Sequence, residues 1–101
     1  MASLTILYWR DIPSEVIVRS GRQAAKRELS ERFIRAIDAA AMHAKARSAD
    51  DYLAEWRKSA PVACGDDLEA EAEAAAARLE AEYDTHRLAQ LAKLDGRESP
   101  A

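Results

Sequence analysis

The sequence predicts an α+β fold in which an N-terminal β-hairpin is packed by three helices, the last one long. Residues 4–10 (LTILYWR) and 15–19 (EVIVR) are rich in β-branched and aromatic residues, and they flank a turn that contains Pro13. Apolar residues then recur at helical spacing through 30–46, and residues 68–94 have high helix propensity throughout. A lone hairpin is marginal in water, so the helices are expected to pack on it.

The turn of this hairpin is expected at 11–14, because proline presets its φ angle and has no N–H to offer a ladder. Arg10 and Asp11 are expected to fix the turn. Alternation along the first strand puts Tyr8 on one face and Trp9 on the other, so the two rings do not form a single clamp. One ring is expected to anchor the helices, and the other to cover a second surface that a partner could share.

The segment after the hairpin is predicted to be a basic connector followed by a helix. Residues 22–29 (RQAAKREL) have room for a helical turn. Ser30 is a suitable N-cap, and Glu31 adds a negative charge to the first turn of a helix expected at about 30–46. The apolar stripe of this helix is formed by Phe33, Ile34, Ile37, Ala40, Ala41 and Ala44.

A short helix and an extended segment are expected next. Ser48 and Asp51 have the spacing of a capping box. The helix that they begin would carry three large residues on one face, namely Tyr52, Leu53 and Trp56. Residues 60–65 (APVACG) interrupt this helix, and the part near 61–64 is a candidate for a short third strand.

The last helix is longer than a domain of this size needs. Its apolar stripe consists of Leu68, Ala72, Ala75, Leu79 and Tyr83. At the usual rise per residue, a helix over 68–94 spans about 40 Å. We therefore expect residues 1–84 to form a single domain. Residues 85–101 are expected to be a projecting helical extension with a frayed tail, in which Leu88 and Leu91 are available to a partner.

Composition limits both the core and the classes of function. Apolar residues make up 49% of the 101 residues, but many are alanine, and there are only one Phe, two Trp and three Tyr. The predicted core is therefore thin, and a partner could supply missing burial. A net charge of −3 argues against a general nucleic-acid binder. The absence of a long apolar run, of a signal-peptide pattern and of a second cysteine predicts a cytoplasmic protein without a membrane span.

Four cations near the end of the hairpin form a candidate anion site: Arg19, Arg22, Lys26 and Arg27. No acidic residue lies between them, and a hairpin end that leads toward a helix suits anions. The alternative is a solvated surface, or pairing with the protein's own acids. Eight of the 18 acids lie later, between Asp66 and Asp84, where Arg78 is the one cation, so charge is segregated along the chain, which steers association. For Asp66 and Asp67 we favour simple stabilisation of a helix N-terminus.

Cys64 is the weak metal or redox candidate. A cysteine that precedes a helix can have a lowered pKa, although a lone cysteine is more often a small buried hydrophobe. His43 and His86 lie far from it in sequence, so a site within one chain is not indicated. The sequence contains no nucleophile elbow, no glycine-rich phosphate cradle and no evident pair of catalytic carboxylates, so independent catalysis is not expected and no cofactor is indicated.

Five stretches of the chain match a known family in order. They are YWRDIP (8–13), VIVRSGR (16–22), AKREL with RF and AIDAAAM (25–42), DDYLAEWR (50–57) and CGDDLEAEAEAAAARLEAEYD (64–84). From Tyr8 to Asp84 the chain resembles the small bacterial domain family catalogued as "virulence factor". A similar domain occurs in staphylococcal conserved virulence factor proteins beside a NifU-like scaffold domain and HEAT repeats, and relatives are encoded near folate-linked enzymes. The resemblance implies an accessory role near iron–sulfur or one-carbon metabolism, but it identifies no catalytic residue.

Two hypotheses of function follow. The first is a protein-interaction module that binds or completes a larger metabolic enzyme or assembly, with contacts expected from Tyr8, Trp9, Trp56, Leu88 and Leu91. The second is a small anion- or nucleotide-binding module that uses the basic segment 19–27. The sequence specifies neither the partner nor the oligomeric state.

Overall fold

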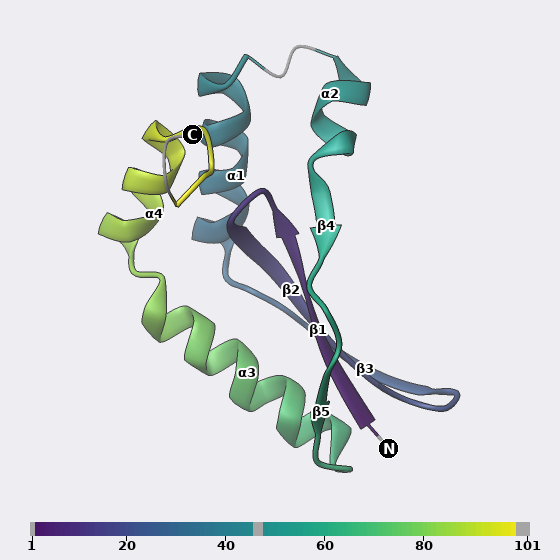
Figure 1. The fold of residues 1–101 in the computed structure, drawn as a ribbon. Coiled ribbons are helices and arrows are strands. Elements are labelled where there is room, and N and C mark those ends of the chain that lie inside the picture. The colour runs from purple at the N-terminus through teal and green to yellow at the C-terminus, as the bar shows by residue number, and fades with distance from the viewer. Residues whose placement is uncertain (1, 46–47, 99–101) are drawn as a thin grey trace.

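The computed structural model describes residues 2–45 and 48–98, which form one antiparallel sheet with helices packed on it (Figure 1). The strands are β1 (Ala2–Trp9), β2 (Ile12–Ser20), β3 (Gln23–Glu28), β4 (Trp56–Lys58) and β5 (Val62–Cys64). The helices are α1 (Glu31–His43), α2 (Ala49–Ala54), α3 (Leu68–Glu82) and α4 (Thr85–Lys93). The predicted α+β class is confirmed, and the short strand expected near 61–64 is present as β5.

The sheet is larger than the predicted hairpin because the basic connector is itself a strand. The strand order is β3-β2-β1-β4, and β5 also pairs with β1. Residues 23–28 pair with β2 across a two-residue turn, Gly21–Arg22, instead of forming a helical turn. Gly21 has a φ angle of +60°, which glycine adopts without strain and which suits the first central position of a tight hairpin turn. Pairing in the sheet thus outweighs the helix propensity of residues 23–28 (QAAKRE).

The first turn lies two residues earlier than expected, at Arg10–Asp11, and Pro13 is inside β2. Proline is tolerated there because the β2–β3 pairing ends at Glu15, so β2 has no strand neighbour on that side at Pro13. The pairing of β1 with β2 shifts register beside Ser14, where Leu7 lies opposite Glu15 and Tyr8 opposite Pro13.

Helix α1 packs most of its predicted apolar stripe into the core, where Phe33, Ala36, Ile37, Ala40 and Ala41 are buried. Ile34 was expected in this stripe but is exposed, because it lies beyond the edge of the buried face. It ends at His43, somewhat before the predicted end. The next helix, α2, begins as predicted, since the Ser48 side chain accepts a hydrogen bond from the Asp51 N–H at 3.0 Å. It stops at Ala54, so Trp56 lies on β4, opposite Trp9, and not on the helix.

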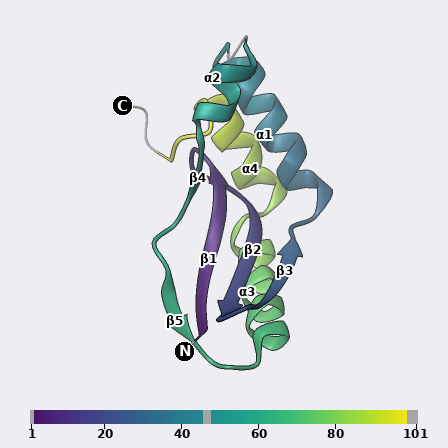
Figure 2. The same cartoon turned by 90° about the vertical axis from the view of Figure 1, so that its right-hand side faces the viewer.

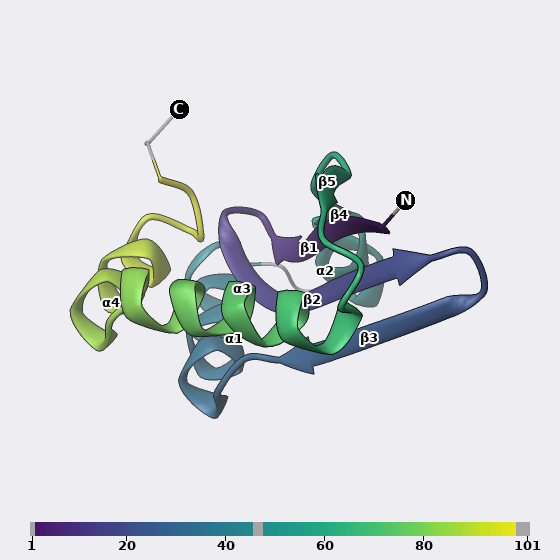
Figure 3. The same ribbon diagram turned by 90° about the horizontal axis from the view of Figure 1, so that it is seen from below.

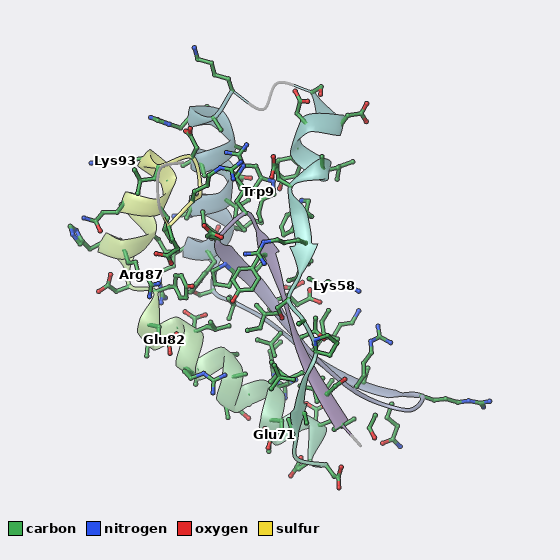
Figure 4. The ribbon with its side chains drawn as sticks, viewed as in Figure 1. Trp9, Lys58, Glu71, Glu82, Arg87 and Lys93 are labelled. Carbon is green, nitrogen blue, oxygen red and sulfur yellow. The ribbon has the colours of Figure 1, made fainter. Side chains whose placement is uncertain are left out.

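The long helix predicted over 68–94 is divided at Tyr83–Asp84 into α3 and α4 (Figure 1). Asp84 caps α4 by accepting a hydrogen bond from the Arg87 N–H at 2.8 Å. In Figure 4, Glu82 and Arg87 mark the two sides of this break. Instead of projecting, α4 lies against α1 and buries Leu88 and Leu91, because these leucines find a place in the core only if the helix changes direction.

Residues 95–98 of the expected frayed tail pack on the domain, and residues 99–101 lie outside the described part of the chain. Gly96 has a φ angle of +84° and lies so close to the Trp9 ring that an added Cβ would be 3.0 Å from Cζ3. Its carbonyl accepts a hydrogen bond from the Asp11 N–H at 2.8 Å. The Asp11 carboxylate in turn accepts one from the Glu98 N–H at 2.7 Å. The C-terminal segment therefore closes the core over the first turn.

Trp9 is the aromatic that anchors the core. It is 0% exposed, and its indole N–H donates a hydrogen bond to the Tyr52 carbonyl at 2.9 Å. Its ring stacks on Tyr52 at 5.8 Å between centroids. In Figure 4 it lies between α1 and α2 at the end of β1. Tyr8 is only partly buried, so the two neighbouring rings have separate roles, as their alternation predicted.

Candidate functional site

The long helices cover only one face of the sheet. Figure 2 shows β1, β2 and β3 in front of α1, α3 and α4, and Figure 3 shows α3 along one side of the same strands. Val16, Val18 and Ala25 point to the helix side and are buried. On the other face, which we call the open face, Thr5, Ile17 and Lys26 lie side by side on β1, β2 and β3. Ile17, at the centre of the open face, is nevertheless only 6% exposed. The side chains around it therefore already cover the centre of this face.

The structure does not bring the four predicted anion-binding cations to one place. Arg19 and Lys26 belong to the open face, and Arg22 lies in the turn at the tip of the β2–β3 hairpin. Arg27 points to the helix side and forms an ion pair with Glu69 of α3. Within residues 2–45 and 48–98, the other three form no ion pair. The hairpin therefore presents three cations on an otherwise acidic chain.

The outer edge of β3 has backbone groups that do not pair with any strand in the described part of the chain. In a two-residue hairpin, the residues next to the turn, here Ser20 and Gln23, exchange both hydrogen bonds, and every second pair does the same. The N–H and C=O groups of the intervening residues, Ala24, Lys26 and Glu28, therefore point outward. The Lys26 carbonyl accepts instead from the Arg27 guanidinium at 2.9 Å, as expected for a carbonyl outside the ladder.

The opposite edge of the sheet is short and interrupted. It consists of β4 and β5, three residues each, which pair with different parts of β1 and are separated by a segment that contains Pro61. Ser59 bridges the gap, because its Oγ accepts a hydrogen bond from the Ile6 N–H and its N–H donates to the Ile6 carbonyl, both at 2.9 Å. Proline and short strands are common ways to prevent strand addition.

A cavity of about 360 Å³ lies beside this interrupted edge, between β1, β5 and α3. Leu4, Ile6 and Ala75 form apolar walls, and Cys64 and Glu71 also line it. In Figure 4, Glu71 extends from the first part of α3 next to β5. Burial raises the pKa of the Cys64 thiol, and the negative charges of Glu71 and Asp66 raise it further. The thiol therefore stays protonated at neutral pH, which disfavours a nucleophilic or metal-binding role.

Metal binding by clustered side chains has no support in the described part of the chain, where no group of three or more His, Cys, Asp and Glu residues is arranged to hold an ion. Nor does any helix in residues 2–45 and 48–98 have the length and apolar character needed to cross a membrane.

Three of the five predicted interaction residues are not accessible in this fold. Trp9, Leu88 and Leu91 are buried in the core. Trp56 is half-buried and packs edge-on against Tyr52. Tyr8 lies under the Arg57 guanidinium, 4.6 Å from its ring centroid, and burial raises the pKa of its phenol.

Arg10 and Asp11 stabilise the turn in the way expected for them. Arg10 Nη1 donates to the Asp95 carbonyl at 2.8 Å, and the Asp11 carboxylate accepts from Arg57 at 3.1 Å. These contacts join the β1–β2 turn to β4 and to the C-terminal segment. They occupy both side chains within the protein and leave them no evident chemical role.

Sequence reasoning missed the β3 edge altogether. The signal was present in Gly21, which with Arg22 makes a two-residue turn between SEVIVRS and QAAKRE. Alternation in the second of these segments then places Ala25 and Arg27 on one face, and Lys26 and Glu28 on the other. The strand was hard to recognise because alanine, lysine and glutamate are better helix formers than strand formers.

Comparison with known families agrees with the resemblance seen in the sequence. A family model described as "Virulence factor" matches residues 7–92. The chain belongs to this family. The Virulence factor match runs from the end of β1 almost to the end of α4, so it includes the helix that was expected to lie outside the domain. No curated protein and no solved structure gave a significant match.

Proposed function

We propose that this Virulence factor domain is a protein-interaction module that binds a larger protein through its β2–β3 hairpin. The observation that carries the proposal has two parts: the outer edge of the six-residue strand β3 has no strand partner, and three cations have no acidic partner, in the described chain. A net charge of −3 makes this local positive charge distinctive. The hairpin is thus suited to an acidic surface of another protein.

The other hypotheses have less support. The small-anion hypothesis required four converging cations, but Arg27 points away from Lys26 and is already paired with Glu69. Catalysis through Cys64 is disfavoured by the raised pKa of its thiol. A role beside one-carbon or iron–sulfur enzymes, implied by the family resemblance, stays a prediction about which larger protein is bound.

The experiment is a comparison of two charge variants in an affinity capture of the tagged chain from mild lysates of the source cells, with mass spectrometry. The double variant Arg19→Glu with Arg22→Glu reverses the charge at the tip of the hairpin. Lys58→Glu with Arg78→Glu makes the same change of charge near the other edge, at exposed residues that form no ion pair in the described chain. Wild type and the control pair should retain one protein in near-stoichiometric yield, whereas the hairpin pair should lose it.

Two outcomes would contradict the proposal. The first is the absence of any reproducible near-stoichiometric protein with wild type. The second is equal recovery with both variant pairs, because the hairpin would then not be the contact. The interaction should also weaken as salt is raised, since it depends on exposed charges.

A further inference from the structure

We infer that the bound segment of the partner is an acidic β-strand that adds antiparallel to the outer edge of β3. This inference rests on the proposed function and goes further, because it specifies the conformation and the side-chain pattern of the partner. An alternative contact by charge alone would use the same cations but would leave the backbone of β3 unpaired. The two modes therefore make different predictions for the amide groups.

The backbone of β3 provides the template. Ala24, Lys26 and Glu28 repeat every second residue, about 7 Å apart, which is the spacing at which an antiparallel neighbour pairs. The backbone groups of β3 that bond to β2 are those of Gln23, Ala25 and Arg27. An added strand would displace only one side-chain contact, the bond from the Arg27 guanidinium to the Lys26 carbonyl, while the same guanidinium keeps its ion pair with Glu69.

The two faces of the added strand meet opposite charges. On the open face it would lie next to Lys26, with Arg19 on the strand beyond. On the helix side it would approach the first turn of α3, where Asp67 and Glu69 line a hollow beside Ala24. Acidic residues are therefore favoured at alternate positions only, and small or neutral residues between them.

Glu28 refines this pattern at one end. It lies on the open face directly opposite Glu15, and neither carboxylate has a salt-bridge partner among the described residues. The partner position next to Glu28 should therefore be basic. In antiparallel order, the preferred side chains facing the open side are one basic residue followed by two acidic ones.

The test uses two synthetic hexapeptides of the same composition. The first is Lys-Thr-Glu-Thr-Glu-Thr, which places its charges on one face of a strand, and the second is Lys-Glu-Glu-Thr-Thr-Thr, which places its acids on both faces. Each is titrated into the full chain and followed by NMR chemical shifts and amide hydrogen exchange. The alternating peptide should bind several-fold tighter. It should slow exchange at Ala24, Lys26 and Glu28, whereas Ala25 and Arg27 are already protected in the free protein.

A pair of variants at Ala24 separates the backbone from the charge. Ala24→Pro removes one outward N–H without changing the charge and leaves the β2–β3 bonds intact, while Ala24→Val retains the N–H. The proline variant should weaken binding of the alternating peptide about tenfold, and the valine variant should leave it unchanged. If Ala24→Pro alters the fold, as seen in its amide spectrum, the exchange pattern of the wild type decides the question alone.

The outcomes distinguish this inference from the proposed function. Equal affinity for the two peptides without protection at the three amides would overturn strand addition. Strand addition would also be overturned if capture of the cellular partner depended on Arg19 and Arg22 but was unaffected by Ala24→Pro. In that case the proposed function would stand. A free protein that dimerises with these same amides protected would assign the edge to a second copy of the chain and would also overturn the inference.

Discussion

The two edges of the sheet differ in how they expose backbone groups that another strand could pair with. On one side, β4 and β5 are three residues each, are separated by Pro61 and are held to β1 through Ser59. On the other side, β3 runs for six residues without proline, and its outward backbone groups are unpaired by any strand of the described chain. Lysine on an edge discourages uncontrolled pairing, and the acidic partner that we propose would neutralise the charge of Lys26. This long, charged edge is the feature on which the proposed contact site rests.

The largest expected effect comes from the residue that holds the interrupted edge in place. Trp9 pairs with Ile12 on β2 and with Trp56 on β4. Trp9→Ala should destabilise the protein by about 3–5 kcal/mol, because it removes a fully buried ring and leaves a cavity. Chemical denaturation measures this loss. Tyr8→Ala at the neighbouring, partly exposed ring is the control and should cost clearly less; equal costs would show that Trp9 is not the anchor.

A smaller loss is expected at the turn that begins the continuous edge. Gly21 has open space around it, so the cost of a side chain there is confined to its φ angle of +60°. Gly21→Ala should destabilise the protein by about 1–2 kcal/mol. Gly21→Asn should cost less, because asparagine tolerates this conformation better. If the two variants are equally stable by thermal unfolding, the turn geometry is not what positions β3.

A third prediction concerns the bridge across the interrupted edge. Ser59→Ala removes the bond from the Ile6 N–H to Ser59 Oγ and should cost about 1 kcal/mol. The effect should be local, with faster amide exchange at Ile6 and no change at Arg27 on the other edge. Faster exchange at both sites would mean that the two edges are coupled, which would weaken the contrast between them.

The smallest effect is one of reactivity, not stability. The raised pKa of Cys64 keeps its thiol protonated, so alkylation by iodoacetamide should be slow at pH 7 and should accelerate as pH rises above the usual range of a thiol. A cysteine at the other edge, Ala24→Cys in a Cys64→Ala background, lies beside Lys26 and opposite Arg19. Those cations favour the thiolate, so it should react several-fold faster at pH 7. A faster reaction at Cys64 would contradict the electrostatic difference between the edges.

The features predicted from sequence were those with strong periodicity. Most of the predicted α1 stripe is buried, as are Ala72, Ala75 and Leu79 on α3 and Tyr83 just after it, since an amphipathic pattern indicates the core directly. Ile34 was also placed in the α1 stripe, but it is 40% exposed. The strand β3 and the break at Asp84 were not predicted, because both lie in segments of high helix propensity. In each case the outcome depends on a partner outside the segment itself, β2 for the strand and α1 for α4, and the helix propensity of the segment does not depend on that partner.

For the candidate site, the sequence predicted which charged residues are present but not how they are arranged. Counting charges identified the cations at 19–27, but their division between two faces depends on β3 being a strand. Trp9, Leu88 and Leu91 were expected to meet a partner and are instead the protein's own core. A large apolar residue has the same sequence signature in both situations, so burial within the fold can be recognised only when the whole chain is assembled.

The contact between Gly96 and Trp9 has a consequence for synthesis on the ribosome. Trp9 is made long before Gly96, the glycine that lies against its ring. The turn after Trp9 is tied to the same late segment through the bond from Arg10 to the Asp95 carbonyl. The nascent chain must therefore carry an incompletely covered tryptophan until residues 95 and 96 have left the exit tunnel. The domain can therefore finish folding only after this segment has emerged, and a chaperone that recognises exposed aromatic residues would have its opportunity before that moment.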